Sequence, residues 1–131
     1  MEKDELIERL SGRIERYCAV EDNYDLELTF DELLIEWDAF DDSLESDECD
    51  GVLEQAKNVN SEARRLMFAM GRSAPDDIVY MVQEMLIKVA DDIESAKQSE
   101  KLSHDRASAL AQGFRKRVEL LSKAMCPDIA N

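Results

Sequence analysis

Apolar residues recur every three or four positions along most of this chain, and this spacing constrains the fold more than any other feature. The pattern is most complete over residues 75–97, where apolar side chains cover about half of a helical circumference. A helix with so wide an apolar arc is typical of the buried centre of a domain. The apolar positions are Ile78, Val79, Met81, Val82, Met85, Leu86, Val89, Ala90, Ile93 and Ala96.

Four further segments favour helices. Residues 4–20 place one apolar face at Leu6, Ile7, Leu10, Ile14 and Cys18. Residues 52–70 form a second amphipathic segment, followed by Gly71 at a position that suits a helix end. Ser103 predicts the cap of a last helix that runs to about residue 125. Thr29 and Glu32 form a capping box, which predicts a helix from about residue 30 to residue 47.

Residues 23–30 show a different pattern, because Tyr24, Leu26, Leu28 and Phe30 alternate with polar residues. Alternation of this kind is typical of a strand, but no second segment offers a partner. We therefore predict an extended linker that packs its apolar side on the helices, with an edge that pairs with another chain as the alternative. The prediction is an all-α fold: one domain over residues 1–131, a small bundle of about five helices, a short extended segment near residues 23–30 and a frayed tail at residues 126–131.

Composition excludes several classes of protein. Three cysteines, widely spaced and without a CxxC motif, favour neither a disulfide framework nor a zinc site. No apolar run approaches the roughly 18–20 residues of a membrane span, and no secretory signal is visible, so we expect a cytoplasmic protein. A single histidine and the lack of a glycine-rich phosphate loop give no catalytic arrangement. We therefore predict a protein without enzymatic activity, cofactor or metal.

Negative charge is concentrated in one part of the chain. The formal net charge is −15, and residues 17–56 contain no lysine or arginine. The acids and bases of the rest of the chain balance, so this acidic surface segment carries the whole imbalance. A general need for solubility would not require such a local distribution.

Part of this charge falls on one side of the helix predicted from about residue 30. At 100° per residue, Asp31, Asp38, Asp42 and Glu45 lie within about 60° of one another, along a row of about 20 Å. We call these four residues the carboxylate stripe. Repulsion between the acids and the negative end of the helix dipole both oppose this arrangement. Such a local conflict often marks a functional surface.

The carboxylate stripe predicts a partner-binding site. Ile35 projects beside the stripe and resembles an apolar anchor with a charged rim, although a single exposed isoleucine is also common. We therefore predict that Asp31, Ile35, Asp38, Asp42 and Glu45 bind and block a basic protein. Immunity proteins, antitoxins and DNA-mimic inhibitors of nucleases or of nucleic-acid-binding proteins share this size, charge and helicity. The negative charge disfavours direct binding of nucleic acid. The sequence does not decide whether the protein forms a homodimer.

Three alternatives remain open. The stripe is neutralised internally if Arg64, Arg65 or residues 115–117 pair with it across the bundle. The protein is a helical chaperone or assembly subunit if it docks through the apolar side of residues 24–30. It is a magnesium-dependent hydrolase if carboxylates of two helices hold the metal. The candidates for that role are Glu32, Glu36, Asp91, Asp92 and Glu94, of which the last three are expected to point to water.

Overall fold

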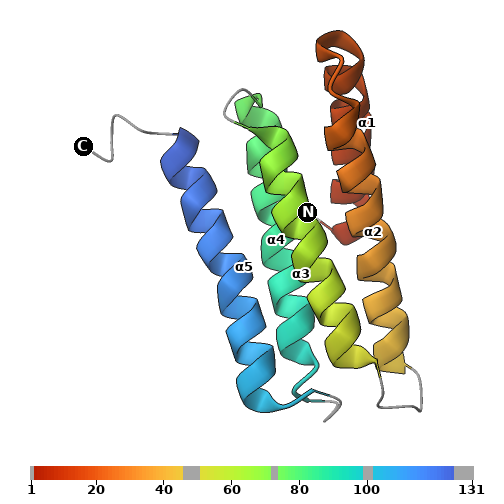
Figure 1. Ribbon diagram of the computed structural model, residues 1–131, viewed down its shortest axis with the longest axis vertical. Coiled ribbons are helices and arrows are strands. Elements are labelled where there is room, and N and C mark those ends of the chain that lie inside the picture. The colour runs from red at the N-terminus through yellow and green to blue at the C-terminus, as the bar shows by residue number, and fades with distance from the viewer. Residues whose placement is uncertain (1, 46–50, 72–73, 99–101, 126–131) are drawn as a thin grey trace.

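The computed structural model describes residues 2–45, 51–71, 74–98 and 102–125, and the side chains up to residue 122. These residues form five helices that lie side by side (Figure 1). The all-α bundle predicted from the sequence is therefore confirmed. The helices are α1 (Lys3–Glu21), α2 (Tyr24–Glu45), α3 (Val52–Met70), α4 (Asp76–Ser95) and α5 (His104–Met125).

The main helix contacts form a closed ring. Helix α1 packs against α2 and α4, α3 packs against α2 and α5, and α4 packs against α5. The apolar faces of all five helices meet in one core, which includes the large side chains of Phe30, Trp37, Phe40 and Phe114. Each helix therefore has an inner side within the core and an outer side that faces solvent.

Most helix boundaries follow the predicted signals. Helix α3 has the predicted bounds, and Gly71 after it adopts φ of 60°, a conformation that favours glycine. Helix α4 begins after Pro75 and buries the widest set of side chains, as its apolar pattern predicted. Helix α5 begins after Ser103, whose Oγ accepts a hydrogen bond of 3.3 Å from the Arg106 N–H.

The prediction of an extended segment near residues 23–30 is wrong, because α2 begins at Tyr24. The alternating apolar residues fit a helix equally well, since residues four apart share a helical face and residues two apart lie on opposite faces. Leu26 and Phe30 are accordingly buried, whereas Tyr24 and Leu28 are exposed. Thr29 does not cap the helix. Its Oγ1 donates a hydrogen bond of 2.8 Å to the carbonyl oxygen of Asp25, one turn earlier in α2.

A tight turn at Asp22 and Asn23 allows α2 to start so early. Asp22 adopts a left-handed conformation with φ of 58°, and its N–H donates to the carbonyl oxygen of Cys18 at the end of α1. Asn23 N–H donates to the same oxygen at 3.2 Å. The Asn23 side chain then donates from Nδ2 to the carbonyl oxygen of Ala69 at 3.2 Å, which ties the turn to α3. Asp and Asn are the non-glycine residues that best tolerate this conformation.

Two predicted features lie outside the described residues. These are the frayed tail at residues 126–131 and most of the break between α2 and α3. Within the described helices, none has a stretch both long enough and apolar enough to cross a membrane.

Candidate partner-binding surface

The partner-binding residues predicted from the sequence all lie on the outer side of α2. Leu26, Phe30, Leu33, Trp37 and Phe40 occupy the inner side and are buried. The predicted residues project away from this core, and Ile35 is 60% exposed. The structure thus brings the five residues together on one helix surface, and their binding role stays a prediction. They are Asp31, Ile35, Asp38, Asp42 and Glu45, and each is exposed.

Little positive charge lies near the carboxylate stripe. Lys3 Nζ lies 3.9 Å from Asp38 Oδ1, and it makes a closer contact of 2.8 Å with Asp41 Oδ2 beside the stripe. Within the described part of the chain, Asp31, Asp42 and Glu45 have no cationic group within 4.0 Å. The stripe therefore presents most of its charge to solvent.

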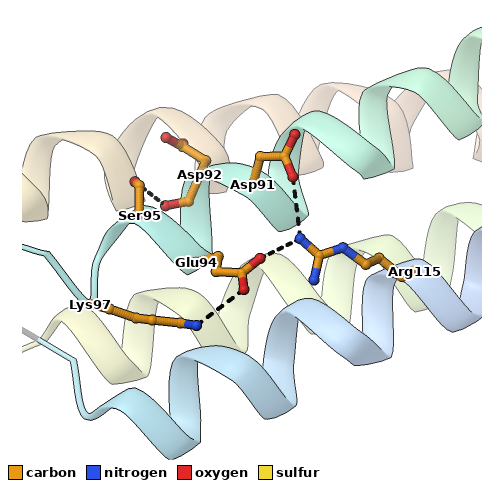
Figure 2. Close-up of polar contacts among 6 residues, drawn as sticks. All are labelled: Asp91, Asp92, Glu94, Ser95, Lys97 and Arg115. Atoms are coloured by element: carbon orange, nitrogen blue, oxygen red, sulfur yellow. Dashed lines mark hydrogen bonds and ion pairs between the residues drawn. The ribbon is translucent and has the colours of Figure 1, made fainter.

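Two arginines that were candidates to neutralise the stripe are engaged elsewhere. Arg115 on α5 contacts Asp91 at 3.3 Å and also Glu94, both on α4 (Figure 2). Arg65 contacts Glu62 at 3.2 Å within α3. Arg115 and Arg65 are thus committed to ion pairs with acids of α4 and α3, away from the outer side of α2.

The Arg115 contacts form a small polar network between α4 and α5. Figure 2 shows the Arg115 guanidinium between Asp91 and Glu94, with Lys97 Nζ on the other side of Glu94 at 3.1 Å. The hydrogen bond from Arg115 lowers the pKa of Glu94, and the hydrogen bond from Lys97 adds to this effect. Glu94 therefore stays ionised, and its charge is balanced locally.

A second cluster, beside the stripe, was missed by sequence reasoning. Trp37 Nε1 donates a hydrogen bond of 2.8 Å to Asp92 Oδ2, and Lys3 Nζ lies 4.0 Å from the centre of the Trp37 ring. Burial and, to a lesser extent, a hydrogen bond with Asp41 together raise the pKa of Asp92 to about 7, against the opposing effect of the Trp37 hydrogen bond. These four residues are part of the lining of an open pocket of about 450 Å³.

The expectation that Asp92 points to water is wrong, because its carboxylate accepts the Trp37 hydrogen bond. Asp92 follows Val89 by three residues and precedes Ala96 by four, so it lies at the rim of the apolar face of α4. Two signals in the sequence are consistent with this contact. A buried tryptophan N–H requires an acceptor, and a carboxylate at such a rim is able to supply one.

The candidate metal ligands do not come together. Glu32 is exposed on α2, and Glu36 accepts a hydrogen bond from Gln55 Nε2 on α3. Asp91 and Glu94 contact Arg115 instead. Among the described residues, no three acidic, histidine or cysteine side chains converge as a metal site requires.

Comparisons with known protein families, with characterised proteins and with solved structures find no match to this chain. The chemistry available at the α2 surface is that of a row of carboxylates on one helix. Such a row attracts and orients cationic side chains.

Proposed function

We propose that this chain is a non-catalytic binding protein that engages a basic partner through the outer side of α2 and blocks that partner. The observation that carries the proposal is the exposure of the carboxylate stripe, of which only Asp38 lies near a cation among the described residues. Immunity proteins, antitoxins and nucleic-acid mimics that inhibit nucleases or nucleic-acid-binding proteins are the classes that use such a surface.

The energetics of the stripe support this proposal. Like charges at Asp38 and Asp42, four residues apart, oppose the helix by a few tenths of a kcal/mol, about 0.2–0.5. The last turn of α2 contains no basic residue to offset the helix dipole. A cationic partner relieves both effects when it binds. An exposed field of one sign also accelerates the encounter with a partner of opposite charge.

A second candidate is a chaperone or assembly subunit that docks through apolar surface, and the observation in its favour is the exposure of Tyr24 and Leu28 on α2. Leu26 is buried, so this surface is part of a helix and no longer the strand edge that the sequence suggested. Binding through apolar contacts alone is insensitive to salt, which separates this candidate from the first.

The test compares two variants with the same change in net charge. In the stripe variant the four acids of the carboxylate stripe become neutral amides. In the control variant four exposed acids on other helices become amides. The stripe variant carries Asp31→Asn, Asp38→Asn, Asp42→Asn and Glu45→Gln. The control variant carries Glu8→Gln, Glu15→Gln, Glu84→Gln and Glu119→Gln.

Each protein is immobilised and exposed to a lysate of the source cells at about 50 mM salt, and bound proteins are eluted as the salt rises to about 500 mM. The proposal predicts that a basic protein binds to the wild type and to the control variant, elutes as the salt rises and does not bind to the stripe variant. Equal retention by all three proteins contradicts it. The blocking role is then tested by measuring the activity of the captured protein. The wild type and the control variant are expected to inhibit this activity, and the stripe variant is not.

A further inference from the structure

The outer side of α2 contains an ordered row that extends beyond the carboxylate stripe. Starting at Tyr24, exposed residues follow at alternating intervals of four and three positions as far as Glu45. This is the repeat of the contact positions in a coiled coil, which averages 3.5 residues. We call this row the α2 seam. It consists of Tyr24, Leu28, Asp31, Ile35, Asp38, Asp42 and Glu45.

The α2 seam is continuous and unobstructed by the core. At 100° per residue its members stay within an arc of about 100°, on the side of the helix away from the buried residues. The seam is about 30 Å long, from a rise of about 1.5 Å per residue. Helix α2 runs along the right-hand edge of the bundle in Figure 1. These dimensions match the contact surface of a single partner helix of about three heptads.

The two halves of the α2 seam differ in chemistry. The first half contains Asp31 and the three apolar members, Tyr24, Leu28 and Ile35, whose exposed fractions are 62%, 60% and 60%. The second half consists of Asp38, Asp42 and Glu45. A helix that fits this seam is therefore mainly apolar along one half of its contact face, with a basic residue opposite Asp31, and basic along the other half.

A second copy of this chain fits poorly when the two seams are aligned over their full length. In a parallel pair of seams each acid faces an acid of the other copy. In an antiparallel pair Asp31 faces Asp38 of the other copy, and Leu28 faces Asp42. Both arrangements place like charges together or desolvate carboxylates against apolar side chains, which opposes association. Nucleic acid is disfavoured by its own negative charge.

We propose that the α2 seam docks one basic amphipathic helix of a partner protein. Apolar side chains of that helix pack on Tyr24, Leu28 and Ile35, and its lysines or arginines pair with Asp38, Asp42 and Glu45. The inference rests on the proposed function. It adds that the binding segment of the basic partner is a helix and states which of its side chains face which residues of the seam. It also assigns Tyr24 and Leu28 to the same interface as the stripe, whereas the sequence pattern suggested a separate apolar edge.

The test uses three synthetic peptides of about three heptads and identical composition. In two of them lysine lies opposite the four acids of the seam, and leucine lies opposite Tyr24, Leu28 and Ile35. One of the two has the order of residues for parallel pairing and the other has the order for antiparallel pairing. The third contains the same residues with the leucines and lysines moved off the contact positions. Affinity is measured by fluorescence anisotropy of labelled peptide at about 50 mM salt.

The proposal predicts that one of the two ordered peptides binds at least about tenfold more tightly than the shuffled peptide. Ile35→Ala and Leu28→Ala weaken this binding by about threefold or more each, whereas Leu120→Ala, at a half-exposed residue of α5, does not change it. The stripe variant weakens the binding and reduces its dependence on salt.

Three results overturn the proposal in different ways. Equal binding of the ordered and shuffled peptides, with loss of both in the stripe variant, shows that charge alone determines binding. The helix register is then wrong, and the proposed function stands. Binding of an ordered peptide that is unchanged in the stripe variant contradicts both the charge pairing in the seam and the proposed function. The lack of binding by both ordered peptides also overturns the docking of a helix.

Discussion

Trp37 and Asp92 join α2 to α4 by a hydrogen bond of 2.8 Å across 55 residues of sequence. The indole N–H donates and the carboxylate accepts, on the inner side of the helix whose outer side carries the carboxylate stripe. Lys3 lies over the Trp37 ring and contacts Asp41. These contacts hold the inner side of α2 against α4, and the outer side faces solvent.

The stability of the protein is expected to depend on pH through Asp92. Its pKa is about 7 in the folded state and 3.8 in the unfolded reference, so the folded state binds this proton more tightly between those values. The free energy of unfolding therefore falls as pH rises from about 4 to about 7 and levels off above that range. Asp92→Asn removes this contribution. Urea unfolding of the wild type and the variant at several pH values measures the difference, with Glu84→Gln at an exposed position of α4 as the control. Identical pH dependence in the wild type and in Asp92→Asn contradicts the assignment.

Trp37→Phe is expected to destabilise the protein, because it removes the donor to a partly buried carboxyl group. The cost is about 1–3 kcal/mol for the unpaired acceptor, with a further cost for the smaller ring. Thermal unfolding followed by circular dichroism measures it. Tyr80→Phe, at a residue that is 62% exposed, is the control and leaves stability within about 0.5 kcal/mol. A double variant with Asp92→Asn costs less than the sum of the two single changes, and strict additivity is the contrary result.

Leu26 and Leu28 are expected to differ sharply, because the early start of α2 buries one and exposes the other. Leu26→Ala costs about 2–5 kcal/mol through the cavity that it leaves. Leu28→Ala stays within about 0.5 kcal/mol. Chemical unfolding of both variants makes the comparison. Similar effects for the two leucines support an extended segment and contradict a helix that begins at Tyr24.

Arg115→Gln is expected to raise the pKa of Glu94 toward its ordinary value, because the hydrogen bond from Arg115 is the main cause of the lowered value. The change in stability is small, since the contact lies near solvent. Titration of the Glu94 carboxyl carbon by NMR follows the pKa directly. Lys116→Gln removes a neighbouring exposed charge and serves as the control. An unchanged Glu94 titration in Arg115→Gln contradicts the contact.

The bundle was predictable from the sequence because its helices are defined by local signals. Gly71 and Ser103 mark helix ends through their own backbone and side-chain chemistry, and the apolar period identifies each inner face. The start of α2 was not predictable from periodicity, because Tyr24, Leu26, Leu28 and Phe30 satisfy both a period of two and a spacing of four. The turn at Asp22 and Asn23 decides between them.

The candidate surface was predictable in position, and its surroundings were not. The helical wheel places the stripe opposite the buried side of α2, and this needs no tertiary information. The pairing of Arg115 with Asp91 and Glu94 depends on how α4 packs against α5. The contact between Trp37 and Asp92 likewise depends on the approach of α2 to α4. Partners of this kind are set by packing between distant segments, which a single sequence does not specify.

The most direct test of the central claim is the affinity of the captured basic partner for the wild type, the stripe variant and the control variant at about 50 mM and about 200 mM salt. The account predicts that the stripe variant binds about tenfold or more weakly than the wild type at low salt and that its affinity depends less on salt, while the control variant stays within about twofold. Equal losses in the stripe and control variants contradict the account, because binding then follows the total charge of the protein and not the position of the acids on α2.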